Sequence, residues 1–288
     1  GVSAPRTVAM ALIRDLYSGR PMARVMSLAM TLFVLVPAIS PLMGQWIMTT
    51  FGWRSIFVAF ILFAIIGFLW LGLRQPETHP VELRQPMRLK PYFVAMREVA
   101  MNRVVMTYTL AMSLSYGALF AYLSSAQQLY VETYNAGTSF PLYFAGIAII
   151  SGGSGVLNSL VVMRIGMRSL ATLAYFVMLI ASILFALTLY LWDIPLETAF
   201  YLFLLFSVIS FFVPGLTFGN LNALAMEPMG HIAGMASAVM GAVSTLLGVL
   251  IAVPIGLAYD GSPMPLLIGF SVCSAMSLTL MLSNPKDA

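Results

Sequence analysis

The sequence predicts an all-α polytopic membrane protein. Eight apolar segments and a shorter ninth are separated by short polar connections. The eight are close to the ~20 residues with which a helix crosses ~30 Å of hydrocarbon, and in lipid, segments of this kind satisfy their backbone groups as helices. Hydrophobic residues make up 60% of the chain and charged residues 8%, with a mean hydropathy of +0.95. Because little of the chain remains outside the membrane, we expect it to move a solute across.

The expected spans follow one another closely along the chain. They are the shortened segment 1–13 and the full spans 25–48, 53–73, 104–126, 140–162, 169–191, 196–218, 233–257 and 264–282. The chain begins within an apolar segment and without an initiator methionine, so we expect an amino-terminal part to be missing. The single cysteine, Cys273, has no partner for an internal disulfide.

Basic residues predict the orientation. If the spans alternate in direction, one face receives the linkers 14–24, 74–103, 163–168 and 219–232 and the tail 283–288. That face carries twelve basic residues: Arg14, Arg20, Arg24, Arg74, Arg84, Arg88, Lys90, Arg97, Arg103, Arg164, Arg168 and Lys286. The opposite face carries Arg54 alone. Positive residues stay in the cytoplasm, so the basic linkers are placed there. No basic-aromatic surface remains outside the membrane, so we expect no nucleic-acid partner.

The segment 74–103 is the predicted domain boundary. It contains four prolines, which indicate an irregular connector. A short amphipathic piece follows, with Phe93, Met96 and Val99–Ala100 on one face, and we expect it to lie at the membrane interface. Residues 1–73 are then the remainder of an amino-terminal helical bundle, 74–103 a cytoplasmic linker, and 104–288 a carboxy-terminal six-helix bundle. Transporters are often built from two such repeated halves.

The span 25–48 contains a paired proline break. Pro37 and Pro41 are one turn apart, and each removes a backbone donor from the helix. Ser40 and Gly44 add a small face that permits close helix contact. We interpret this span as a hinge or seal between two bundles, and an ordinary kinked helix is the alternative.

The span 233–257 has glycines at a regular spacing. Gly234, Gly241 and Gly248 recur every seven residues and form one smooth face for another helix. Static packing and motion against a neighbour both fit this pattern.

Arg6 is the only charged residue well inside a span. An intramembrane arginine usually faces a water-filled cavity or an acidic partner, and we expect the same here. The alternative is that its side chain snorkels to the cytoplasmic headgroups.

Five stretches carry a family resemblance. They are 14–19 (Arg-Asp-Leu-Tyr-Ser-Gly), 37–46 (Pro-Ala-Ile-Ser-Pro-Leu-Met-Gly-Gln-Trp), 51–57 (Phe-Gly-Trp-Arg-Ser-Ile-Phe), 158–166 (Asn-Ser-Leu-Val-Val-Met-Arg-Ile-Gly) and 228–237 (Pro-Met-Gly-His-Ile-Ala-Gly-Met-Ala-Ser). In this order they resemble the major facilitator superfamily drug/proton antiporters, and within them the bicyclomycin/chloramphenicol-resistance (Bcr/CflA) branch. The general motif has glycines where Ser40 and Gln45 stand.

The resemblance implies a major facilitator fold in which the chain supplies helices four to twelve of twelve. The spans 104–126 and 196–218 become the seventh and tenth helices, which line the central cavity of the superfamily. The substrate-cavity residues implied are Arg6, Ser115, Tyr116, Phe120, Phe211 and Phe212. The conformational residues are Pro37, Pro41, Gly44, Gly241 and Gly248, and the cytoplasmic loop motifs contribute Arg14, Asp15, Arg164, Gly166 and Arg168. Aromatic residues of these spans also fit an interfacial belt or helix packing, and Tyr122 and Tyr130 are expected in the belt.

We therefore predict a secondary active transporter for proton-coupled multidrug efflux, conferring antibiotic resistance from a bacterial inner membrane. Its partners would be a small-molecule substrate, protons and lipid, and the full-length protein would be monomeric. No phosphate-binding loop and no cluster of metal ligands or nucleophiles is present, so we expect no enzyme and no cofactor, with a proton gradient as the energy source. A nutrient or metabolite carrier of the same fold is the main alternative. An intramembrane enzyme or a channel is weaker. The proton-coupling carboxylate is expected in the missing helices.

Overall fold

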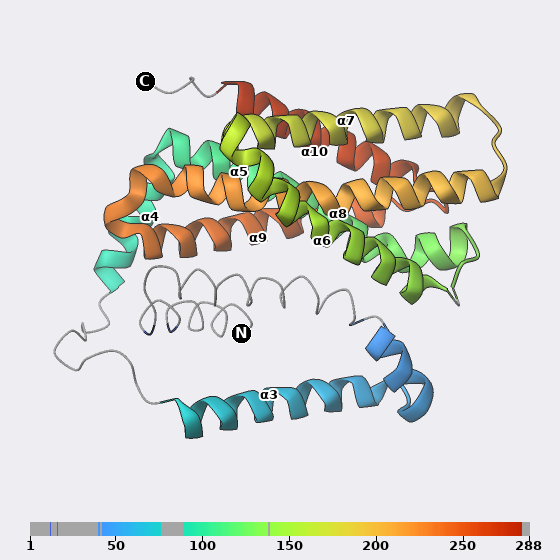
Figure 1. Cartoon of the computed structure of the whole chain (residues 1–288), viewed down its shortest axis with the longest axis horizontal. Helices are drawn as coiled ribbons and strands as arrows, with labels where there is room; N and C mark the ends of the chain where they lie inside the picture. The colour runs from blue at the N-terminus through green and yellow to red at the C-terminus, as the bar shows by residue number, and fades with distance from the viewer. Residues whose placement is uncertain are drawn as a thin grey trace. The chain divides into compact units, whose positions relative to one another are not determined.

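The computed structural model describes residues 42–75, 89–137 and 139–283, together with Leu12, Leu16 and Ser40 (Figure 1). Contacts divide the chain into two compact units, Gly1–Met87 and Arg88–Ala288. Every regular element within the described ranges is a helix. Seven of these helices are long and apolar enough to cross a membrane. The predicted all-α, multi-pass membrane fold is confirmed.

The first unit contains a helical pair joined by a tight turn. Residues 42–51 are helical, so the predicted span 25–48 ends three residues later than expected. Gly52 then adopts φ +84°, a left-handed conformation that glycine supplies without steric cost at a helix end. Helix α3 (Arg54–Arg74) follows and confirms the predicted span 53–73. The Arg54 guanidinium lies 4.6 Å above the Trp53 ring, a cation–π contact at the turn.

The second unit contains the six predicted spans and an additional short helix. Its elements are α4 (Leu89–Met101), α5 (Arg103–Gln128), the π-turn η2 (Leu129–Thr133), α6 (Phe140–Ile165), α7 (Met167–Leu191), α8 (Leu196–Met226), the 3₁₀ turn η3 (Glu227–Ile232), α9 (Ala233–Leu257) and α10 (Met264–Ser283). Helix α8 runs eight residues past its predicted end at 218. It ends at Met226, where the chain continues into the 3₁₀ helix η3 that begins at Glu227-Pro228.

Local sequence sets two helix ends. Asn102 caps α5, and its side-chain oxygen accepts hydrogen bonds from the backbone N–H groups of Val104 and Val105 at 3.0 and 3.1 Å. Gly166 alone separates α6 from α7, with φ +82° and ψ 156°. Only glycine adopts this backbone conformation without strain, so Gly166 permits the direct reversal between two spans.

Helices α5 and α9 run parallel along an extensive contact. The Ser244 hydroxyl donates to the Thr109 carbonyl at 3.3 Å near one end. In the middle, a Cβ added to Gly248 would lie 2.7 Å from the Cβ of Tyr116, and one added to Gly117 would lie 2.7 Å from the Cβ of Ile251. The two backbones therefore approach closely because these glycines have no side chain.

Hydrogen bonds define the directions of two further helix pairs, one parallel and one antiparallel. Helices α6 and α8 are parallel, because Ser151 Oγ donates to Val208 O at 3.4 Å, and Asn220 Nδ2 donates to Asn158 Oδ1 at 2.7 Å further along both helices. Helices α7 and α10 are antiparallel. The Arg168 guanidinium at the start of α7 donates to the Met281 carbonyl at the end of α10, at 2.8 Å. A cation placed there complements the helix dipole of α10.

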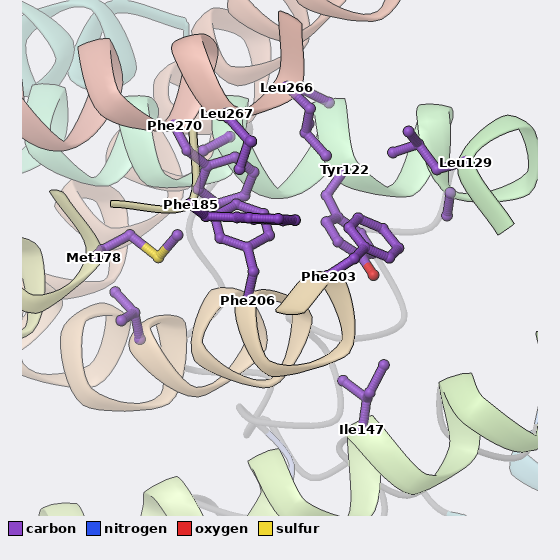
Figure 2. Packing of buried hydrophobic residues seen from close by; sticks show 14 of the residues in the cluster. Tyr122, Leu129, Ile147, Met178, Phe185, Phe203, Phe206, Leu266, Leu267 and Phe270 are labelled. Carbon is purple, nitrogen blue, oxygen red and sulfur yellow. The ribbon is translucent and has the colours of Figure 1, made fainter. Parts of the chain in front are cut away.

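Aromatic rings fill the core of this unit (Figure 2). Phe206 lies between Phe185 and Phe270, with ring centroids 6.0 and 5.2 Å away. Tyr122 stacks on Phe203 at 6.0 Å. Aromatic pairs at such distances add stabilisation beyond the area that they bury.

The belt prediction for Tyr122 and Tyr130 is wrong. Both side chains are fully buried. The Tyr122 hydroxyl donates to Ser207 Oγ at 2.6 Å and lies 3.2 Å from the Tyr130 hydroxyl. These partners satisfy polar groups that would otherwise need interfacial water, so both rings are buried in protein.

The predicted interfacial face of α4, the amphipathic helix before the six spans, is only partly exposed. Phe93, Met96 and Ala100 are exposed, as an interfacial helix requires, but Val99 of the same predicted face is buried in a cluster with Met240. Helix α4 therefore packs against the bundle through part of this face.

We expect Gly166→Ala to destabilise the protein by about 1–3 kcal/mol, because alanine would be held in a strained backbone conformation. Gly146→Ala on α6 is the matched control, since no atom of the described residues lies within 4 Å of its added Cβ. It should be neutral or slightly stabilising. Thermal unfolding of both variants in detergent measures the difference, and equal melting temperatures would contradict the strain at Gly166.

Candidate substrate-binding site

A row of aromatic side chains lies partly exposed on the bundle of α5–α10. Tyr116 and Phe120 stand one turn apart on α5, with ring centroids 5.6 Å apart. Phe218 on α8 stacks on Tyr116 at 4.3 Å, with an interplanar angle of 19°. All three side chains are only partly buried. We call Tyr116, Phe120 and Phe218 the aromatic row. It offers flat apolar faces and one hydroxyl, which suits a moderately apolar ligand.

The aromatic row is supported from behind by α9. Gly248 is buried, and its absent side chain leaves the space that the Cβ of Tyr116 occupies. A Cβ at Gly248 would also lie 3.3 Å from the Gly117 backbone nitrogen. The predicted conformational residue Gly248 and the predicted cavity residue Tyr116 are thus in direct contact, so the α5–α9 approach fixes the position of Tyr116.

Ser115 faces another direction. Its hydroxyl lies 2.7 Å from the Tyr175 hydroxyl of α7 and donates to the Ala111 carbonyl at 3.2 Å. Consecutive helix residues point about 100° apart, so Ser115 is turned into the bundle while Tyr116 is on its partly exposed side. The structure therefore does not bring Ser115 together with the aromatic row.

Phe211 and Phe212 lie about two turns before Phe218 on α8. The Phe211 ring meets Tyr122 edge-on at 5.1 Å and Phe144 at 5.4 Å. Phe212 is partly buried against the same aromatic core. Their roles in a substrate cavity, like those of Ser115 and of the aromatic row, stay predictions.

The remaining predicted residues are distributed over both units. Gly44 is partly exposed in the helix 42–51, and Gly241 is exposed on α9 with no atom of the described residues within 4 Å of an added Cβ. Arg164 is exposed in the last turn of α6. Gly166 and Arg168 have the structural roles given above. The predictions for Arg6, Arg14, Asp15, Pro37 and Pro41 fall outside the described residues.

Sequence reasoning missed the partner of Ser115. Tyr175 is buried on α7 and also donates to the Ala111 carbonyl at 3.2 Å. It lies sixty residues from Ser115, and only the folded bundle, in which the two hydroxyls meet, shows the pairing. The Asn158–Asn220 bond was also missed, although Asn158 opens one of the family stretches.

Titratable groups are sparse at the site. Within the described ranges, no group of three or more His, Cys, Asp or Glu side chains could hold a metal ion. Asp260 lies in the loop between α9 and α10, where hydrogen bonds from the Ser262 hydroxyl and backbone lower the pKa of its carboxyl. The aromatic row itself contains one polar side-chain atom, the hydroxyl oxygen of Tyr116.

Comparison with known proteins identifies the class. The family model described as Major Facilitator Superfamily matches residues 1–253. YdgK of Bacillus subtilis, an uncharacterized MFS-type transporter, is 30% identical over 88% of the chain. The bicyclomycin resistance protein homolog of Haemophilus influenzae is 26% identical over 96%, and the multidrug resistance protein MdtL of Salmonella typhi is 29% identical over 98%.

The chain belongs to the Major Facilitator Superfamily. The predicted resemblance to its drug-resistance members is confirmed by the bicyclomycin and multidrug resistance relatives. The prediction of a transporter is confirmed with it. The chain spans 63%, 68% and 69% of the length of these three relatives, respectively.

We expect Gly248→Ala to disturb the aromatic row and Gly241→Ala to leave it intact. The new Cβ at 248 would force α5 and α9 apart, whereas the one at 241 enters open space. Overpacking of this kind costs about 1–3 kcal/mol. Melting temperature and the affinity for a planar drug, measured for both variants, test the difference. Equal melting temperatures and equal drug binding of the two variants would contradict a stabilising contact between α5 and α9 at Gly248.

Proposed function

We propose that the protein exports small amphipathic compounds across a bacterial inner membrane in exchange for protons. It would do so by alternating access, in which two bundles rock about a central site. The observation that carries the proposal is the aromatic row, formed where the family places its cavity-lining helices seven and ten. Stacking surfaces with few fixed polar groups favour varied apolar ligands over one highly polar nutrient.

The energy source would be the proton gradient, with no bound cofactor and no chemical change of the substrate. The names of the bicyclomycin and multidrug resistance relatives support drugs as the substrate class. Proton exchange is supported by the resemblance to drug/proton antiporters. The full-length protein would work as a monomer, because both bundles that alternating access requires would belong to one chain.

We expect Tyr116→Ala in the full-length protein to weaken drug binding and efflux about two- to tenfold. This is the factor that corresponds to the ~0.5–1.5 kcal/mol of one aromatic contact. Tyr116→Phe keeps the ring and should retain most of the efflux. Drug accumulation and proton release, measured in inverted membrane vesicles at matched protein levels, report both binding and coupling.

Tyr190→Ala is the matched control, because this tyrosine of α7 is 78% exposed and far more accessible than Tyr116. It should leave efflux unchanged. Equal efflux by Tyr116→Ala and the control would remove the aromatic row from the substrate path. Proton flow in the same direction as the substrate would instead identify a symporter of the same fold.

A further inference from the structure

A narrow cavity lies inside the bundle, away from the aromatic row. Its volume is about 20 Å³, and it is bounded by α5, α7, α8 and α10. Five of the lining side chains carry hydroxyl groups: Ser115, Tyr175, Ser210, Ser274 and Ser277. Each of the five is at least nine-tenths buried. A cavity needs about 10–15 Å³ by this measure to hold one water molecule, so the space admits one water and excludes a drug-sized ligand.

One of these hydroxyls needs a partner. Ser277 is 1% exposed, and its Oγ has no hydrogen-bond partner among the described residues. Some buried serines of the bundle are satisfied by their own helix: Ser113 donates to the Thr109 carbonyl at 2.8 Å, and Ser182 donates to the Met178 carbonyl at 2.9 Å. Ser277 lines the cavity with a buried hydroxyl that has no such bond.

The sequence of α8 removes one regular backbone hydrogen bond beside the cavity. Pro214 has no backbone N–H, so it cannot donate to the Ser210 carbonyl, which would be its regular helical acceptor. Both Ser210 and Pro214 line the cavity. In hydrocarbon, a carbonyl freed in this way must find a donor from a neighbour or from an ordered water.

We propose that this cavity is a water-binding site. One water would donate to the Ser210 carbonyl and exchange hydrogen bonds with the hydroxyls of Ser277 and Tyr175. This gives it the two to four polar partners that buried waters have. The water would replace the helical donor that Pro214 removes from α8, the helix that carries Phe218 one turn later.

The sign of a stability change tests the proposal. If the cavity holds water, Ser277→Ala removes one of its partners and lowers the melting temperature of the full-length protein by about 2–4 °C. If the cavity is dry, the same change removes an unsatisfied buried hydroxyl and leaves the melting temperature equal or higher. Ser113→Ala breaks a hydrogen bond that the structure shows, so it should lower the melting temperature in either case and is the matched control for what the assay resolves. A melting temperature of Ser277→Ala equal to or above that of the unmodified protein would overturn the proposal.

A second measurement detects the water directly. Cys273 lines the cavity and is the one cysteine of the chain. In D₂O, infrared spectroscopy follows exchange of its S–H stretch, identified by the difference from Cys273→Ala. With water in the cavity, the thiol exchanges well before the backbone amides of the bundle. Exchange no faster than those amides would show a dry cavity and overturn the proposal.

Discussion

The close approach of α5 and α9 is the constraint on which the carboxy-terminal bundle depends. Two glycines, Gly117 and Gly248, allow their backbones to meet where any Cβ would collide. In lipid there is no hydrophobic force that drives one helix onto another, so such van der Waals contact between small residues supplies much of the association energy. The contact also fixes Tyr116, and through its stacking on Phe218 it connects α9 with the α8 side of the site.

Many polar side chains in this bundle are satisfied locally or in pairs, whereas the buried hydroxyls of Tyr134 and Ser277 have no partner among the described residues. The hydroxyls of Thr109, Ser113 and Ser182 donate hydrogen bonds to backbone carbonyls one turn earlier in the same helix. Tyr122 and Ser207 bond across helices, as do Asn158 and Asn220. Because hydrocarbon offers no hydrogen bonds, every such group either pairs or requires an ordered water. This rule explains why tyrosines are found deep in the core, and why the hydroxyl-lined cavity stands out from the rest of the interior.

The spans were predictable from the sequence because the thickness of the bilayer fixes their length. Their ends were less predictable. Helix α8 continues through Pro214 to Met226, eight residues past the end that the apolar run predicted. Which side of each helix faces protein was the hardest feature to predict, since spans that are apolar on every side carry no amphipathic pattern. Tyr122 and Tyr130 were misplaced for this reason, because their burial depends on Ser207, far away in the sequence. Tyr116 and Gly248 were both singled out, but the sequence gives no indication that they touch.

Cross-linking of α5 to α9 tests the central claim most directly. A Cβ on Gly256 would lie 3.9 Å from the Cβ of Ser124, within the 3.5–4.5 Å range of disulfides. In a Cys273→Ala background, the pair Ser124→Cys and Gly256→Cys should form a disulfide rapidly under mild oxidation. The pair Ser124→Cys and Gly241→Cys, with the second cysteine four turns away along α9, should not. A cross-link in the second pair, or none in the first, would contradict the parallel α5–α9 contact.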